Sequence, residues 1–332
     1  MTKRPSHDLR DLPGHRPGEW SFLADAASAL GFCAVGVAPV APFEASVVAR
    51  FDTWRQEGRH AQMRYLERWD EVRWHPGHEG MLPGASAVVS VALPVGEGRH
   101  REGIWALVAA HARGRDYHVT IKDKLTQLSL GVRRVFAQAR FRICVDSAPV
   151  PERSWALRCG LGTLGKNGAL MVPGVGPGVL LGELICADVP PPSSAETAGG
   201  EPSCAQCMRC VAACPTGALG EDGRVDARRC LSYHSIENRG DVPEAVARKM
   251  TLLFGCDICL SVCPQHNPAV ESQLAASATA ADLPQTLASL LRGDTSQWQH
   301  SIADTCLHRT GTAALRRNAA LVFHNLKQGT HS

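Results

Sequence analysis

Cysteines in two closely spaced runs are the residues of this chain best suited to chemistry. The first run, from Cys204, has the spacing C-x2-C-x2-C-x3-C-P, and the second, from Cys256, has C-x2-C-x3-C-P. The first spacing is typical of cubane iron–sulfur clusters, in which the fourth cysteine reaches across to ligate the other cluster of a pair. Two such clusters need eight thiolates. The runs contain seven, and Cys230 between them is the natural eighth.

The crosswise pattern of two-cluster ferredoxins predicts the ligands of each cluster. One 4Fe-4S cluster is assigned to Cys204, Cys207, Cys210 and Cys263. The second is assigned to Cys214, Cys230, Cys256 and Cys259. A structural zinc site would need only two C-x2-C pairs, so the other cysteines would be superfluous. A disulfide framework is disfavoured because residues 1–18 are polar and contain no apolar signal-peptide core.

Three further motifs could carry chemistry, and each also has a structural reading. Asp146 follows a predicted strand, where a carboxylate can face a cleft, although an Asx-turn or helix N-cap is the commoner role. His118 resembles part of a corrinoid-binding D-x-H-x-x-G motif, but Ile121 replaces its glycine, so a lower histidine ligand is not indicated. The structural alternative for His118 is a hydrogen-bonded residue at the start of a helix. Gly160-Leu-Gly-Thr-Leu-Gly165 matches G-x-G-x-x-G but follows a helical pattern, which argues against a dinucleotide site. The remaining cysteines, predicted to be core residues, are Cys33, Cys144, Cys159, Cys186 and Cys306.

The elements that must position these residues alternate along the first half of the chain. Helices are predicted over 20–30, 43–66, 117–139 and 152–159, and strands over 32–37, 87–93, 141–145, 169–172 and 179–187. This alternation indicates an α/β core. A Pro, Ser and Gly-rich linker over 190–200 then marks a boundary. The predicted division is a disordered tail (1–18), an α/β domain (19–190), a cluster domain (191–275) and a helical C-terminal segment (276–332).

Composition agrees with an intracellular protein of about two domains. The chain has 332 residues, of which 44% are hydrophobic, and it has no apolar run of membrane-spanning length. Thirteen cysteines without a secretory signal indicate a reducing cytoplasm and metal ligation. The net charge of +3 is compatible with a basic patch but does not by itself indicate nucleic-acid binding.

Taken together, these pieces resemble the epoxyqueuosine reductase family, the cobalamin-dependent iron–sulfur enzymes that complete queuosine in tRNA. The matching stretches are 114–118 (GRDYH), 145–153 (VDSAPVPER), 160–162 (GLG), 165–167 (GKN), both cysteine runs, 229–233 (RCLSY), 236–237 (IE), 254–257 (FGCD) and 316–318 (RRN). They lie in order over most of the chain, so their combination is more specific than any single motif.

The resemblance implies a nitroreductase-like α/β domain that binds base-off cobalamin, followed by a ferredoxin-like domain whose two clusters pass electrons to cobalt. It implies that Asp146 donates the proton to the departing epoxide oxygen, with a pKa raised by burial. The corrinoid-pocket residues that it carries over are Arg73, Tyr117, His118, Arg153, Asn167, Leu170 and Ser232. Thr163 stands where the family usually has an aromatic residue.

The resemblance also implies the partners. The substrate is a tRNA carrying epoxyqueuosine in an unstacked anticodon base, and the electron donor is of the flavodoxin or ferredoxin type. The chain is expected to act as a monomer in the cytoplasm. Phosphate contacts are expected from the basic loop over 99–115 and from the C-terminal residues Arg309, Arg316, Arg317 and Lys327, although solvated charge is the alternative for each. The helical-repeat extension of longer members is missing, which we expect to remove an accessory tRNA-binding surface.

Two other functions remain open at the level of sequence. A corrinoid iron–sulfur reductase of a small molecule, such as a dehalogenase-like enzyme, would use the same cofactors, but respiratory members usually carry an export signal. A ferredoxin-like electron carrier would need the clusters and no corrinoid. Cobalamin binding therefore separates the electron carrier from both enzymes.

Overall fold

The computed structural model describes residues 19–96, 106–193, 204, 206–274, 283–294, 299 and 302–328. The predicted tail over 1–18, most of the predicted linker and residues 97–105 of the basic loop lie outside this part of the chain. The helices and strands are α1 (Phe22–Ala29), β1 (Ala34–Pro39), α2 (Ala45–Gln56), η2 (Arg64–Leu66), α3 (Asp70–Arg73), β2 (Ala85–Pro94), η4 (Ala110–Ala112), α4 (Tyr117–Val135), β3 (Arg140–Cys144), α5 (Glu152–Arg158), β4 (Thr163–Leu164), β5 (Leu170–Met171), β6 (Val179–Ala187), α6 (Arg209–Ala213), α7 (Leu231–Ile236), α8 (Glu244–Ala247), α9 (Ile258–Ser261), α10 (Leu283–Arg292), η5 (Cys306–Thr310) and α12 (Thr312–Lys327).

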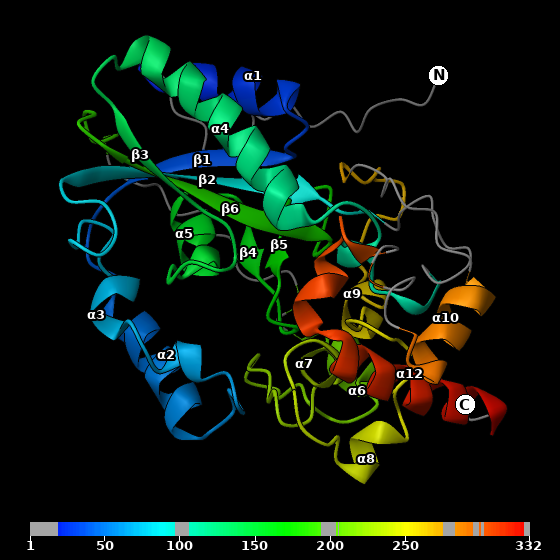
Figure 1. Ribbon diagram of the computed structural model, residues 1–332. Helices are drawn as coiled ribbons and strands as arrows, with labels where there is room; N and C mark the ends of the chain where they lie inside the picture. The colour runs from blue at the N-terminus through cyan, green and yellow to red at the C-terminus, as the bar shows by residue number, and fades with distance from the viewer. Residues whose placement is uncertain are drawn as a thin grey trace.

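A four-stranded sheet with the order β1-β2-β6-β3 forms the centre of the first domain. Helices α1 and α4 cover one of its faces and α5 lies against the other (Figure 1). The predicted alternation of helices and strands is confirmed, but each neighbouring pair in this sheet is antiparallel. An antiparallel sheet of this kind belongs with α+β rather than α/β folds, because the order of elements in a sequence does not fix strand direction.

Close packing against the second face depends on a glycine in the edge strand β1. A Cβ atom added to Gly36 would lie 1.9 Å from the backbone oxygen of Cys159, at the end of α5. A side chain at Gly36 would therefore push α5 away from the sheet. Since the residues just before α5 include Asp146, this contact helps to fix the site.

The prediction of one helix over 43–66 is wrong in its second half. Helix α2 ends at Gln56, and Gly58 (φ +66°) and Ala61 (φ +53°) then adopt left-handed backbone conformations that a helix cannot contain. The short helices η2 and α3 follow. Helix α2 contacts the cluster domain through Trp54, whose Nε1 donates a 2.6 Å hydrogen bond to the carbonyl of Val225.

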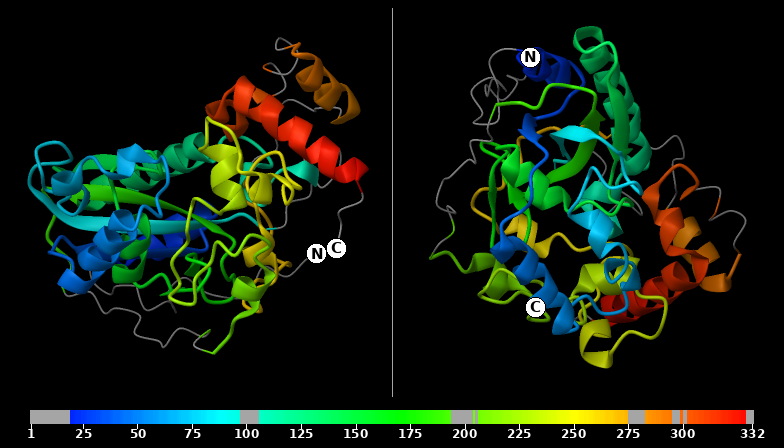
Figure 2. Two further views of the ribbon diagram at one scale, coloured as in Figure 1. Left: turned by 90° about the horizontal axis from the view of Figure 1, so that it is seen from below. Right: turned by 90° about the vertical axis from the view of Figure 1, so that its left-hand side faces the viewer.

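A second hydrophobic core joins the cluster domain to the C-terminal helices. Leu231, Leu253 and Phe254 of the cluster domain pack with Leu315 of α12 and with Val108, which belongs to the first domain by sequence. Helices α10 and α12 lie side by side in both views of Figure 2. The C-terminal helices therefore share a core with the cluster domain, so the predicted boundary at 275 does not separate two cores among the described residues.

A last feature of the fold concerns membranes. Among the helices of the described ranges, none combines the length and the apolar character needed to cross a bilayer.

Candidate functional site

Asp146 lies just beyond β3 in a backbone conformation that is unusual for a residue with a side chain. Its φ is +55°, in the left-handed region that Asp and Asn tolerate better than most residues. Its backbone N–H donates a 2.5 Å hydrogen bond to Glu152 Oε1, at the start of α5. This turn directs the Asp146 carboxylate toward the start of α4, where Tyr117 Oη donates to Oδ2 at 2.8 Å.

His118 connects Asp146 to a second, buried carboxylate. Its Nε2 lies 3.0 Å from Asp146 Oδ2, and its Nδ1 lies 2.6 Å from Asp116 Oδ1. Asp116 is the N-cap of α4, because the same oxygen accepts a 2.9 Å hydrogen bond from the His118 backbone N–H. The predicted helix-start role of this stretch is therefore present, and His118 additionally bridges two acids.

The pKa values of His118 and Asp146 are shifted by burial and by the hydrogen bonds that these residues make. Burial by itself would lower the pKa of His118, but hydrogen bonds with Asp116 and Asp146 outweigh burial and raise it. Burial would raise the pKa of Asp146, yet the hydrogen bonds from His118 and Tyr117 lower it. The prediction of a raised pKa for Asp146 is therefore wrong for this structure. The reason is that its side chain is 58% exposed and has two hydrogen-bond donors, which the sequence pattern did not reveal.

Two further acids, the half-buried Glu152 and the fully buried Glu183, were not singled out from the sequence. Burial, aided by the charge of Asp146, raises the pKa of Glu152 to about 8. Glu183 in β6 is fully buried, and burial raises its pKa well above the ordinary value. Its Oε1 accepts a 3.2 Å hydrogen bond from Ser90, while Oε2 has no partner among the described residues. The family-like stretch 145–153 includes Glu152, which was the available signal, whereas Glu183 had none.

The other residues carried over as pocket residues come from four separate elements. Arg73 at the end of α3 is buried, and its Nε has no hydrogen-bond partner among the described residues. Arg153 on α5 donates a 2.5 Å hydrogen bond to the carbonyl of Gly168, next to Asn167 in the hairpin of β4 and β5. Leu170 lies in β5 and is buried, Ser232 lies in α7, and Thr163 lies half-buried in β4.

Tyr65 on η2 was not predicted, and it connects Arg73 with the Asp146 side of the site. Partial burial of this half-exposed side chain, together with the charges of Glu237 and Asp146, raises the pKa of its phenol. Arg73 acts in the opposite direction on the same group. The four residues therefore lie near one another, although they are far apart in the sequence.

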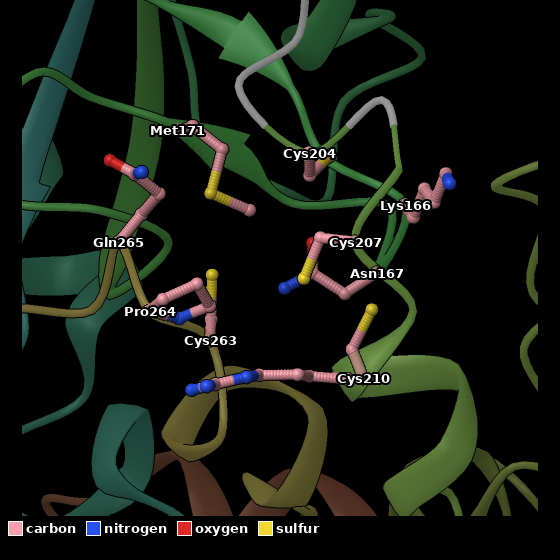
Figure 3. A pocket seen from close by; sticks show the side chains of 10 residues that line it. Lys166, Asn167, Met171, Cys204, Cys207, Cys210, Cys263, Pro264 and Gln265 are labelled. Atoms are coloured by element: carbon pink, nitrogen blue, oxygen red, sulfur yellow. The ribbon is translucent and has the colours of Figure 1, made fainter.

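Four of the predicted cluster ligands line one pocket. The walls of this pocket include Cys204, Cys207, Cys210 and Cys263. Figure 3 shows the sulfur atoms of Cys207, Cys210 and Cys263 turned into the shared space, with Lys166, Asn167 and Met171 at its border. The four cysteines come from both runs, as the crosswise assignment requires.

The other four predicted ligands form a second group. Burial raises the pKa of the Cys256 thiol to about 12, and the charges of Cys230 and Cys214 add to this effect. Burial also raises the pKa of Cys259 to about 12, with contributions from Cys256, Cys230 and Cys214 of this group and from Cys210 of the first group. The Ala218 N–H donates a 3.2 Å hydrogen bond to Cys214 Sγ. Asn167 connects the two groups, because its Nδ2 donates to the Cys259 carbonyl at 3.3 Å.

The glycine-rich stretch 160–165 serves chain packing. A Cβ atom on Gly162 would lie 2.1 Å from the backbone oxygen of Met171, across the β4 and β5 hairpin. The stretch leads from α5 into this hairpin, so the geometry of a dinucleotide-binding turn before a helix is not formed. The remaining cysteines stay apart from both groups. Cys144, Cys159, Cys186 and Cys306 are buried, and Cys33 is half-buried.

Four C-terminal basic residues were expected to contact phosphate, but two of them, Arg309 and Arg317, form hydrogen bonds within the protein. Arg309 Nε donates a 3.0 Å hydrogen bond to Asp116 Oδ2. Arg317 donates to the carbonyls of His234 (2.7 Å) and Asn238 (3.0 Å), and also to that of Gly240. Arg316 is exposed on α12.

Comparison with known proteins adds to this geometry. Residues 75–147 match a family model described as epoxyqueuosine reductase QueG, DUF1730, and residues 203–266 match a 4Fe-4S double cluster binding domain. An epoxyqueuosine reductase of Aliivibrio fischeri is 33% identical over 307 residues, which cover 90% of this chain and 81% of the relative. One of Synechocystis is 33% identical over 306 residues, covering 86% and 98%. The structure of epoxyqueuosine reductase from Streptococcus thermophilus superposes with a TM-score of 0.75 at 25% identity, covering 92% of this chain and 80% of that one.

Proposed function

The chain belongs to the epoxyqueuosine reductase family, and from this premise we propose that it reduces epoxyqueuosine to queuosine in a tRNA anticodon loop. The observation that carries the proposal is the likeness to curated epoxyqueuosine reductases over nearly the whole chain. A solved relative, 24% identical, is described with an epoxyqueuosine-modified tRNA stem loop, which agrees with a tRNA substrate. Loss of an epoxide oxygen as water, leaving a carbon–carbon double bond, consumes two electrons and two protons.

Two 4Fe-4S clusters supply the electron path in this proposal. One cluster is held by Cys204, Cys207, Cys210 and Cys263, and the other by Cys214, Cys230, Cys256 and Cys259. The convergence of the first four on one pocket supports this pairing. The donor that reduces the clusters is a one-electron carrier of the flavodoxin or ferredoxin class.

Cobalamin is the cofactor that the pocket residues carried over from the family would hold, namely Arg73, Tyr117, His118, Arg153, Asn167, Leu170 and Ser232. The Nε of Arg73 is buried and has no hydrogen-bond partner among the described residues, which suits a ligand rich in amide and phosphate oxygens. Both ring nitrogens of His118 already contact carboxylates, which agrees with a cobalamin that takes no ligand from His118. When bound, the cofactor supplies low-potential electrons to the epoxide.

In this proposal, side chains of the protein transfer the protons that the reaction consumes. Asp146 is exposed enough to meet a substrate, and its carboxylate is the group that passes a proton to the departing oxygen. The hydrogen bonds of Tyr117 and His118 hold its orientation. Because those bonds also favour the ionised form, Asp146 must first receive the proton that it delivers.

Anaerobic reconstitution tests the proposed function. The full chain is loaded with iron, sulfide and cobalamin, reduced chemically, and incubated with a stem-loop RNA containing epoxyqueuosine, after which the nucleosides are identified by mass spectrometry. Queuosine should appear only when cobalamin is present. Protein that carries eight irons but binds no cobalamin would instead favour an electron carrier. Loaded protein that leaves epoxyqueuosine intact would contradict the proposal.

A further inference from the structure

A continuous chain of hydrogen bonds runs from the C-terminal segment to Asp146. Arg309 Nε and one terminal nitrogen each lie 3.0 Å from Asp116 Oδ2. Asp116 Oδ1 contacts His118 Nδ1 at 2.6 Å, and His118 Nε2 contacts Asp146 Oδ2 at 3.0 Å. The Asp116 backbone N–H also donates a 2.7 Å hydrogen bond to the carbonyl of Asp304. Residues nearly two hundred positions apart in sequence thus form one polar row.

Burial differs along this row. Asp116 and His118 are only 3% and 4% exposed, whereas the side chains of Arg309 and Asp146 at its two ends are 42% and 58% exposed. A buried carboxylate is costly unless it is paired, and Asp116 is paired with both Arg309 and His118. The row therefore has a buried, charge-paired middle and an exposed end at Asp146 that can reach a substrate.

The proton within the row belongs to His118. Its Nδ1 and Nε2 each face a carboxylate oxygen, and while both carboxylates are ionised, both contacts are satisfied only if both nitrogens donate, which requires the imidazolium. Some features of its surroundings raise the pKa of His118 and others lower it. Asp116 and Asp146 raise the pKa of His118, while burial opposes them. His118 in turn lowers the pKa of the neighbouring His111, which burial also lowers. Glu152, whose pKa is raised to about 8, and the ring of Tyr117, stacked on His118 at 4.0 Å, complete its surroundings.

We propose that His118 stores the proton that Asp146 passes to the departing epoxide oxygen, and that Arg309 and Asp116 are positioning residues that hold His118 ready. The proposal rests on the proposed function. In each transfer the Nε2–H bond of His118 breaks as an O–H bond of Asp146 forms, and that O–H bond then breaks as the substrate oxygen takes the proton. Solvent reprotonates the imidazole, so two transfers and two electrons from the reduced clusters yield the alkene and water.

The test measures the pKa of each histidine separately, including that of His118. Exchange of the histidine C2 hydrogen for deuterium, followed by mass spectrometry, gives each imidazole pKa in the full chain loaded with clusters and cobalamin. His118 should titrate above its ordinary value of about 6.5. In Asp116→Asn, which keeps an N-cap oxygen but loses the charge, its pKa should fall by roughly one unit or more. Arg309→Gln should increase KM little and slow turnover.

Single-turnover rates across pH complete the test. The wild-type rate should fall as pH rises through the His118 pKa, because the stored proton is lost, and this fall should begin at lower pH in Asp116→Asn. His118→Gln should lose the pH dependence and about a hundred-fold of the rate. His78→Gln, a change at an exposed histidine outside the row, should leave both unaltered.

If the wild-type protein reduces epoxyqueuosine, two outcomes would still overturn the proposed proton transfer from His118 to Asp146. One is a His118 that is neutral at pH 7, and the other is a His118→Gln variant with a wild-type rate and pH profile. Cluster and cobalamin contents, measured for every variant, separate such results from misfolding. Failure of the proposed function itself would be seen differently, as a loaded wild type that forms no queuosine at any pH, and it would overturn both proposals.

Discussion

Asp146 combines a strained backbone with a carboxylate that is held from two sides. Its left-handed φ of +55° costs free energy for most residues with a side chain, and the bond from its N–H to Glu152 offsets part of that cost. Such conformations are often found where a side chain must be aimed at a reaction. The turn and the two donors Tyr117 and His118 together fix where the carboxylate oxygen lies.

Replacement of Asp146 by Asn tests its role as the final proton carrier. Asn tolerates the left-handed backbone and keeps the shape, but it cannot pass a proton. Cluster content, cobalamin binding and tRNA affinity should therefore survive, while single-turnover product formation should fall by roughly a hundred- to ten-thousand-fold. Turnover within a few-fold of wild type would show that Asp146 is only a turn residue.

Cys230 tests the crosswise ligand assignment. Because it is assigned to one cluster, Cys230→Ala should remove that cluster and leave the other, so iron should drop from about eight to about four per chain. The matched control is Cys306→Ala, which removes a buried thiol outside both groups and should leave the iron content unchanged. Loss of all iron in Cys230→Ala would mean that the two sites do not form independently.

Among the elements, α12 shows that neighbouring residues of one motif can have different roles. Arg317 of its Arg-Arg-Asn stretch was expected to contact phosphate, but it donates to carbonyls of the 234–240 segment. Asn318 is fully buried and donates to the carbonyls of Ser235 and Leu253 at 2.8 and 2.9 Å. These bonds join α12 to α7, to the turn that follows α7 and to the chain before Cys256.

Arg317→Gln should therefore destabilise the cluster domain. Hydrogen bonds from a charged donor to buried carbonyls contribute about 1.5–3 kcal/mol each, so we expect a loss of roughly 2 kcal/mol or more in the free energy of unfolding. Arg316→Gln, one residue earlier on the exposed side, should change stability by less than about 0.5 kcal/mol. Anaerobic thermal unfolding of the cluster-loaded proteins measures both, and equal midpoints for the two variants would contradict the assignment.

The features that could be predicted from the sequence are those that depend on residues close together in the chain. Periodicity located β1, β2, β6 and α5 within a few residues, and cysteine spacing located both cysteine groups. The break after α2 was missed although Gly58, just past the end of the helix, was an available signal, whereas the left-handed Ala61 gave none. The antiparallel order of the sheet, the bonds of Arg309 and the lowered pKa of Asp146 all depend on contacts between distant segments, which no local pattern encodes.

At the scale of the whole molecule, three distant parts of the chain meet at the start of α4. The first domain contributes Asp146, the cluster domain shares a core with Val108, and the C-terminal segment contributes Arg309. The Ala110 N–H, between Val108 and α4, donates a 2.6 Å hydrogen bond to Asp257, next to the proposed cluster ligand Cys256. In the proposed mechanism, the residues that supply electrons and those that supply protons therefore contact the same short stretch of chain.

A tRNA substrate must reach this region, and the exposed face of α12 is where we expect part of its backbone to bind. Counterion release makes phosphate contacts salt-dependent, so affinity for the stem loop should fall steeply from low to moderate salt. Arg316→Glu should weaken binding and reduce the slope of log affinity against log salt by about one, without changing iron or cobalamin content. Arg134→Glu makes the same charge change in the last turn of α4, at the end of that helix far from α12 (Figure 1), and should leave the slope unaltered. If both variants bind like wild type, α12 is not part of the RNA surface; binding that ignores salt altogether would argue instead for a small-molecule substrate.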